Sequence, residues 1–334
     1  MKNKRTVPFI LKLFIGIFVL FGIFIAAMVF GAAETTLKDL WLVLTTNGAG
    51  DSLSMIREIR LPRVIAAMFT GASLAVAGAI MQGLTRNPLA DPGLLGLTAG
   101  ANLALAVTIV FIPAANYFGI MIACFIGAAV GTIMVLSIGA IKKGGYSPFR
   151  IVLAGAAVTA FLTAIAEGIG IYFKISQEVS MWTAGGLVGT TWGQLNIIIP
   201  FITIGIFLAI ILSKQLTILS LSEEVAVGLG QKTVQIKMIL FTAIIILAGA
   251  AVALVGNIAF VGLMIPHIVR AFVGSDYRFI IPMSAIIGAS FMLLADLVGR
   301  TISAPYETPV AAIVSIIGLP FFLFIVRKGG QSFS

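Results

Sequence analysis

The sequence predicts an all-α membrane protein of about ten transmembrane helices, and three observations support that fold class. The 334 residues are 60% hydrophobic and 10% charged, with a mean hydropathy of +1.15, whereas soluble domains carry about 25% charged residues. Apolar runs of about 20 residues, long enough to cross a ~30 Å hydrocarbon core, recur from Phe9 almost to the C-terminus. The 36 glycines suit helices that pack closely in lipid. We interpret residues 1–334 as one polytopic membrane domain.

Charged residues, prolines and glycines divide the chain into ten expected spans. The first follows the basic residues Lys2, Lys4 and Arg5, but it is longer than a signal-peptide core, so we expect it to be retained. The eighth is short for a crossing, so we expect it to be tilted or broken. The expected spans are residues 8–32, 60–84, 93–112, 117–141, 148–173, 193–213, 233–255, 258–271, 278–299 and 307–326.

The distribution of basic residues predicts the orientation. With ten crossings and a cytoplasmic N-terminus, most of the 21 basic residues fall on the cytoplasmic side, as the positive-inside tendency requires. Both termini are then cytoplasmic. Arg57, Arg60 and Arg63 are exceptions that crowd the outer mouth of the second span. Either they snorkel to headgroups or pair with Glu58 and Asp51, or they form a cationic docking rim for an acidic partner.

A weak internal similarity suggests an inverted repeat. Residues 71–92 align without a gap to residues 249–270, with identical residues at six positions. The offset is five spans, an odd number, so spans 2–5 and 7–10 would have opposite orientations in the membrane, as in many transporters. Close helix packing alone explains any single glycine of the two segments equally well.

Several functional classes are excluded by what the chain lacks. A single cysteine, Cys124, excludes an internal disulfide, and a single histidine, His267, excludes a multi-histidine metal site or an enzyme that needs a paired base. We interpret His267 as a hydrogen-bonded packing residue rather than a proton carrier. There is no GxxxxGK motif, so an ATP-hydrolysing motor must be another polypeptide. We therefore expect a membrane protein without enzyme activity, metal site or bound cofactor of its own.

Four segments resemble a known family. They are "IRLPR" at 59–63, "GASLAVAGAIMQGLTRNPLADPGLLGLTAGA" at 71–101, "GNIAFVGLMIPHIVR" at 256–270, and "ADLVGR" with "ETP" within 295–309. Together they resemble the FecCD family, the permeases of ferric siderophore, haem and vitamin B12 ABC importers. The resemblance implies a fold like the vitamin B12 importer permease. It also implies that the chain carries a ferric siderophore or similar iron chelate by ATP-driven alternating access in the inner membrane of a bacterium.

The resemblance also implies partners. These are cytoplasmic ATPase subunits that bind ATP and Mg²⁺, an extracellular or periplasmic substrate-binding protein, and a second permease subunit that is either identical or related. Membrane lipid surrounds the assembly, and no nucleic acid is expected. Haem or cobalamin remains open as the cargo.

The same resemblance assigns site residues. Arg60, Arg63 and Arg300 correspond to a socket for glutamates of the binding protein, with Arg57 as a less certain member. Residues 216–233 resemble the coupling segment that contacts the ATPase, with a merely solvated connector as the alternative. The candidate coupling residues are Leu219, Ser222, Glu223, Glu224, Ala226, Gly228 and Gly230.

Two acids lie inside expected spans, where ionisable groups are costly. Asp296 precedes Arg300 by four residues, so an i, i+4 ion pair accounts for it. Glu167 has no such partner, and we expect it to line the translocation path. A secondary transporter driven by an ion gradient is the competing function. It should carry acids at the middle of the membrane, whereas here the acids are expected toward span ends or in loops.

Overall fold

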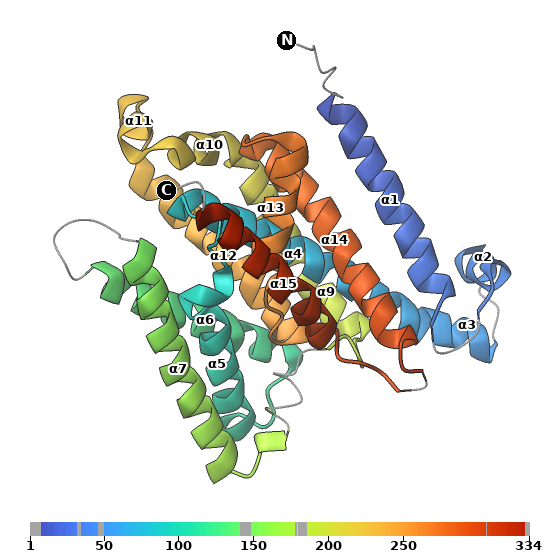
Figure 1. The fold of residues 1–334 in the computed structure, drawn as a ribbon. Helices are drawn as coiled ribbons and strands as arrows, with labels where there is room; N and C mark the ends of the chain where they lie inside the picture. Colours follow the sequence, from blue (N-terminus) through green and yellow to red (C-terminus); the bar gives the residue numbers. More distant parts are fainter. Residues whose placement is uncertain are drawn as a thin grey trace.

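The computed structural model describes residues 8–31, 35–45, 50–140, 148–177, 179, 186–304 and 306–330. In these ranges the chain forms helices and connecting segments, and no strand occurs (Figure 1). Ten apolar helices correspond one to one with the ten expected spans. They are α1 (Phe9–Val29), α4 (Leu61–Thr85), α5 (Leu97–Phe111), α6 (Tyr117–Ala140), α7 (Pro148–Tyr172), α9 (Trp192–Ile211), α12 (Thr233–Val255), α13 (Val261–Val273), α14 (Tyr277–Thr301) and α15 (Val310–Gly330).

Eight of the described helical segments are long and apolar enough to cross a membrane, whereas α5 and α13 are shorter. The short eighth span is therefore confirmed in α13. The third span is also shorter than expected, because η2 (Pro92–Leu95) and Gly96 precede α5. Gly96 has a φ of +69°, a conformation in which glycine carries no steric penalty. The two short helices occupy corresponding positions in the two proposed repeats.

The remaining helices lie at the two ends of the bundle (Figure 1). At one end, α2 (Leu37–Thr45) is followed by α3 (Asp51–Met55) and a π-helical turn, η1 (Ile56–Arg60), which continues into α4. At the other end lie α10 (Ser213–Leu221) and α11 (Glu223–Gly228), together with the start of α1 and the end of α15. The first and last spans thus have their free ends on one side, as an even number of crossings requires.

Helix α4 forms the centre of the bundle, with 83% of its most apolar window buried. Two of its glycines permit backbone contact with neighbours. A Cβ atom on Gly71 would lie 2.2 Å from the carbonyl oxygen of Gly288 in α14, and one on Gly78 would lie 1.9 Å from that of Gly262 in α13. Neither position has room for a side chain, and close backbone approach of this kind is a main source of helix association in lipid.

Helix α1 lies at the edge of the bundle, and none of its most apolar window is buried. It packs mainly along α14, where the rings of Phe9 and Phe279 lie 4.4 Å apart. Phe18 on its outer face is 78% exposed. Most of the α1 surface is therefore available to lipid. Its position in the bundle depends on its packing along α14 and on the contacts at its C-terminal end.

Candidate functional site

Three arginines converge at the N-terminal end of α4, the end at which the sequence predicts a docking rim outside the membrane. Arg60 ends the π-helical turn, Arg63 lies in the first turn of α4, and Arg300 lies in the last turn of α14. They are only 6%, 8% and 4% exposed. Together with Asp296 and Glu307 they form what we call the outer arginine cluster. The predicted convergence of Arg300 with Arg60 and Arg63 is confirmed, but the guanidinium groups are enclosed by the chain itself.

Asp296 is the anionic centre of the cluster. Its Oδ1 accepts a hydrogen bond from Arg63 Nε at 2.9 Å, and its Oδ2 lies 3.0 Å from Arg300 Nε. The predicted i, i+4 pair of Asp296 and Arg300 is therefore confirmed. Asp296 is completely buried, and a buried carboxylate is tolerated only when it is paired. One carboxylate joins α4 to α14 and contacts two cations.

The remaining polar groups of the cluster hold the end of α1. Arg60 Nη1 donates to the carbonyl oxygens of Met28 at 2.8 Å and Val29 at 3.1 Å, and it also contacts the Thr35 hydroxyl. Arg300 Nη2 donates to the carbonyl oxygen of Ala27 at 3.1 Å. The last carbonyls of a helix have no partner within the helix, and the helix dipole makes that end negative. The two arginines therefore cap α1.

The acidic partners of Arg63 differ from the pairing considered from the sequence. Arg63 Nη1 forms a 2.7 Å ion pair with Glu307, whose side chain is 35% exposed, in addition to its bond to Asp296. Glu307 belongs to the "ETP" motif, but its 244-residue separation from Arg63 gave no signal of the contact. The side chain of Asp51 lies outside the described residues.

Arg57 lies apart from the cluster and is half-buried. Its Nη2 donates to the carbonyl oxygen of Val43 in α2 at 3.0 Å, and its own carbonyl accepts from the Trp192 indole at 3.0 Å. Arg57 therefore connects the π-helical turn to α2 and α9. Docking by any of the four arginines stays a prediction.

The predicted coupling segment forms two short helices at the opposite end of the bundle, where α11 projects from the surface (Figure 1). The Ser222 hydroxyl accepts from Val225 N at 3.0 Å and caps α11, and Glu223 and Glu224 lie in its first turn, where the helix dipole favours acids. Leu219 and Ala226 are buried and fix the two helices to the protein. Gly228 and Gly230 are exposed, and Gly230 has a φ of +76°.

One of the two acids of α11 is paired within the chain. Glu223 Oε1 lies 2.6 Å from Lys237 Nζ at the start of α12. The hydrogen bond from Lys237 is the main cause that lowers the pKa of Glu223 below its ordinary value. Glu224 is exposed. The segment also presents exposed apolar side chains: the exposed fraction is 69% for Leu221, 45% for Val225 and 65% for Leu229. The predicted coupling segment is thus an accessible surface of mixed apolar and acidic character.

Glu167 and His267 were the other residues that the sequence singled out. Glu167 is exposed on α7, so the chain alone does not enclose a path around it, and its role stays a prediction. His267 is half-buried in α13, and its ring meets that of Phe321 edge-on at 5.9 Å. This contact agrees with the packing interpretation of His267.

Asp91, in the connection between the second and third expected spans, lies among the helices. Asp91 Oδ1 accepts from Gly93 N at 2.8 Å, and the carboxylate lies against the first turn of α13. A Cβ atom on Gly262 would lie 3.1 Å from Asp91 Oδ2 and 3.0 Å from the Leu74 carbonyl oxygen. Since Leu74 is near the middle of α4, Asp91 lies deeper than its place in a connection suggests. One carboxylate thus lies between η2, which precedes α5, and the start of α13.

A small cavity of about 40 Å³ adjoins Asp91. Its polar lining comes from Asp91, Thr98 and Asn257, and the rest from residues that include Leu74 and Ala248, which lie well inside α4 and α12. In the described ranges no group of three or more His, Cys, Asp and Glu side chains is close enough to hold a metal ion.

Comparison with known proteins matches nearly the whole chain to one family. The model of the FecCD transport family matches residues 18–328. The chain is 41% identical over 328 residues to the iron(3+)-hydroxamate import system permease protein FhuB of Bacillus subtilis, covering 98% of this chain and 85% of that protein. It is also 41% identical over 328 residues to the Fe(3+)-citrate import system permease protein YfmD of the same organism, covering 98% and 96%.

A solved structure has the same fold. A metal-chelate type ABC transporter in an inward-facing conformation superposes with a TM-score of 0.81 at 24% identity, covering 96% of this chain and all of that chain. At this identity the likeness establishes the arrangement of helices.

Proposed function

The chain belongs to the FecCD transport family, and from this premise we propose that it is the membrane-spanning permease subunit of an ABC importer for an iron chelate. The single observation that supports this most strongly is the similarity to iron-chelate import permeases along 98% of the chain. The bundle of ten apolar helices has the form that such a subunit needs. The cargo class is a ferric hydroxamate, ferric citrate or a similar chelate.

We further propose that energy and cargo arrive on other polypeptides. Cytoplasmic ATPase subunits bind ATP and Mg²⁺, a binding protein outside the membrane delivers the chelate, and a second permease subunit completes the path. The end with α10 and α11 lies in the cytoplasm together with both termini. The positive-inside distribution of basic residues supports this orientation.

The two ends of the bundle have different proposed partners. Leu221, Val225 and Leu229 give α10 and α11 an exposed apolar surface that suits a cleft in an ATPase, with Glu224 at its edge. At the outer end, carboxylates of the binding protein would approach Arg57 and the outer arginine cluster. Because Arg63 is already paired with Glu307, an incoming carboxylate must exchange with that residue. Glu167 of α7 is proposed to face the path between the two permease subunits.

The proposal is tested by uptake of radioactive iron into membrane vesicles. The chain is expressed with its companion subunits, and iron(III) hydroxamate and ferric citrate are offered separately. We expect accumulation that requires ATP and continues after ionophores collapse the proton and sodium gradients. Uptake that follows an ion gradient and proceeds without an ATPase would show a secondary transporter instead.

Purification of a tagged chain in mild detergent tests the partner set independently. We expect an ATPase and a second permease subunit to copurify, and a matched variant with Val225→Asp in α11 to lose the ATPase alone. If the unmodified chain, correctly inserted, recovers no ATPase, the assignment to an ABC importer is wrong.

A further inference from the structure

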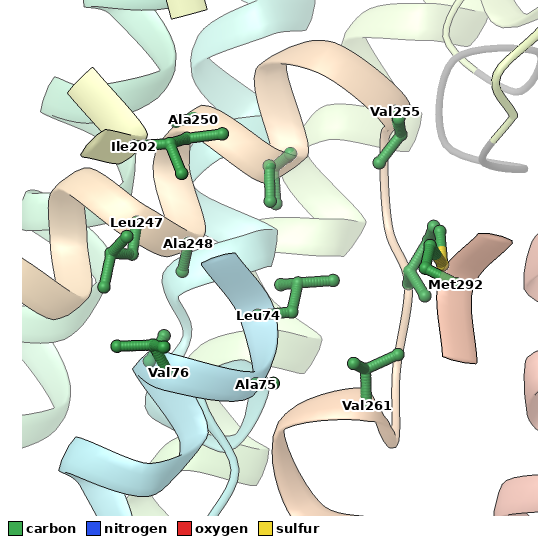
Figure 2. Close-up of a cluster of buried hydrophobic side chains, with 14 of the residues drawn as sticks. Leu74, Ala75, Val76, Ile202, Leu247, Ala248, Ala250, Val255, Val261 and Met292 are labelled. Atoms are coloured by element: carbon green, nitrogen blue, oxygen red, sulfur yellow. The ribbon is translucent and has the colours of Figure 1, made fainter. Parts of the chain in front are cut away.

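The chain between α12 and α13 is irregular at the depth of the membrane. Helix α12 ends at Val255, and Gly256 follows with φ +74° and ψ −150°, a conformation essentially reserved for glycine. Figure 2 shows the chain then running from Val255 to Val261 beside Met292 of α14, and it turns into α13 at Phe260, which has a left-handed φ of +68°. The segment shares a cavity lining with Leu74 and Ala248, which lie well inside their helices. A stretch without helical hydrogen bonds therefore lies within the bundle.

The side chains of this stretch alternate between two environments. Gly256 and Ile258 are buried, whereas Asn257 and Ala259 are exposed. A period of two is the pattern of an extended chain with one face against protein and the other face open. The open face carries one carboxamide and one methyl group, so it is not an apolar face suited to lipid.

The backbone of the segment also lacks protein partners. Within the described part of the chain, the N–H groups of Asn257, Ile258, Ala259 and Phe260 donate to no protein acceptor. Such groups are costly in hydrocarbon, and irregular backbone at membrane depth is tolerated only where it is covered by protein or lines a water-filled cavity. The exposed residues of the segment, Asn257 and Ala259, are not covered by this chain, so a water-filled space on that side would satisfy donors that point to it.

Asp91 lies beside this segment. Its carboxylate accepts a hydrogen bond from Gly93 N at the start of η2, and it lies close to Gly262 at the start of α13, directly after the segment. The chain that leads into α5 and the start of α13 thus meet at one carboxylate. In transporters built from inverted repeats, a pair of short or interrupted helices in corresponding positions marks the substrate site.

We propose that residues 256–260 form a water-exposed wall of the cargo path, where the backbone N–H groups and the Asn257 carboxamide donate hydrogen bonds to the oxygen-rich surface of a ferric chelate and its water. The identity of the cargo rests on the proposed function, whereas the exposure of residues 256–260 to water is independent of it.

Cysteine accessibility tests the wall directly. The single native cysteine, Cys124, is buried, so the unmodified chain serves as the blank. Asn257→Cys and Ala259→Cys are compared with Ile258→Cys, the buried neighbour, and with Phe18→Cys on the exposed face of α1. Each variant is treated in membranes with a charged methanethiosulfonate. This reagent needs a thiolate, which forms in water and not in lipid.

The expected result is reaction at positions 257 and 259 at least tenfold faster than at 258 and 18, in chains shown by mild-detergent chromatography to be folded. Equal rates at 257, 258 and 259 would overturn the extended wall, and so would absence of reaction at both 257 and 259. Absence of reaction would mean that lipid or a second subunit covers the segment.

Uptake of an iron(III) hydroxamate by the labelled importer tests the cargo contact. We expect a bulky label at 257 or 259 to reduce uptake at least tenfold, while treated Phe18→Cys transports normally. Full uptake after complete labelling would overturn the cargo contact. If even the unmodified importer carries no chelate while the labelling pattern holds, the proposed function fails and the water-exposed wall stands.

Discussion

The two ends of the bundle offer partners surfaces of opposite kinds. At the outer end, three arginines are almost entirely buried and bound to Asp296, Glu307 and the last carbonyls of α1. At the other end, α10 and α11 expose apolar side chains and Glu224. The difference teaches that charge density in a sequence does not equal charge on a surface. The arginines of the outer arginine cluster are engaged in contacts that stabilise the fold, whereas the surface of α10 and α11 is accessible to a partner without any rearrangement.

The strongest way to break this comparison is to remove the centre of the outer arginine cluster. Asp296→Asn leaves Arg63 and Arg300 buried without their shared counter-ion, and breaking a buried ion pair costs about 3 to 5 kcal/mol. We expect a large fall in the thermal unfolding temperature of the detergent-purified protein. Asp276→Asn removes a partly exposed pair with Arg278, and asparagine can still cap the start of α14, so this variant serves as control. Equal stability of the two variants would contradict a structural role for the cluster.

The cap on α1 should have the next largest effect. Arg60→Lys keeps the positive charge but loses the planar guanidinium that reaches Met28, Val29 and Thr35. An ammonium group can still bond to one carbonyl oxygen, so the net loss is about that of one hydrogen bond to a charged group, about 1.5 to 3 kcal/mol. We expect a smaller stability loss than for Asp296→Asn, and faster proteolysis between α1 and α2 because the end of α1 is released. Unchanged proteolysis would show that α14 contacts alone hold α1.

The ion pair of Glu223 and Lys237 should contribute less to stability, and only over a limited pH range. The pKa of Glu223 is lowered in the folded chain, so its stabilisation is complete above the ordinary pKa of about 4.3. It is lost as pH falls through the lowered value. Partly exposed pairs contribute about 0 to 1 kcal/mol. Comparing the unfolding temperature of Glu223→Gln with that of the unmodified protein across acidic pH tests this, since the difference should vanish at the lowest pH. A constant difference would assign the effect to packing.

The smallest effect on stability is expected for Val225→Asp. Its side chain is 45% exposed on α11, and surface changes of this kind stay within about 0.5 kcal/mol. The same change should reduce recovery of the ATPase at least tenfold. A loss of stability like that of Arg60→Lys would show that the inner surface is part of the core and would erase the contrast between the two ends.

The sequence predicted the helices well because apolar length is a local property. All ten expected spans correspond to helices, including the short eighth span. The i, i+4 contact between Asp296 and Arg300 was also predictable from helix geometry. The pairing of Arg63 with Glu307 was not, since it depends on how two distant helices meet.

Depth was the other property that the sequence concealed. Asp91 lies between Pro88 and Pro92, close to Arg86 and Asn87, a composition that favours a surface connection. The close approach of Gly78 to Gly262 draws α13 against α4 and brings its first turn to the Asp91 carboxylate. An acid expected in a loop therefore lies among the helices, where the competing transporter class would also place one.

The shortness of α5 affects the bilayer itself. Its 15 residues span about 22 Å, less than the ~30 Å thickness of the hydrocarbon layer. Its last turn carries the exposed ring of Phe111. Where this flank meets lipid, acyl chains must shorten or tilt to match it, while the neighbouring full-length helices impose no such demand. The rate of the transport cycle should therefore depend on acyl-chain length. Lipids with longer chains should disfavour the conformation in which most of the α5 flank is in contact with the hydrocarbon layer.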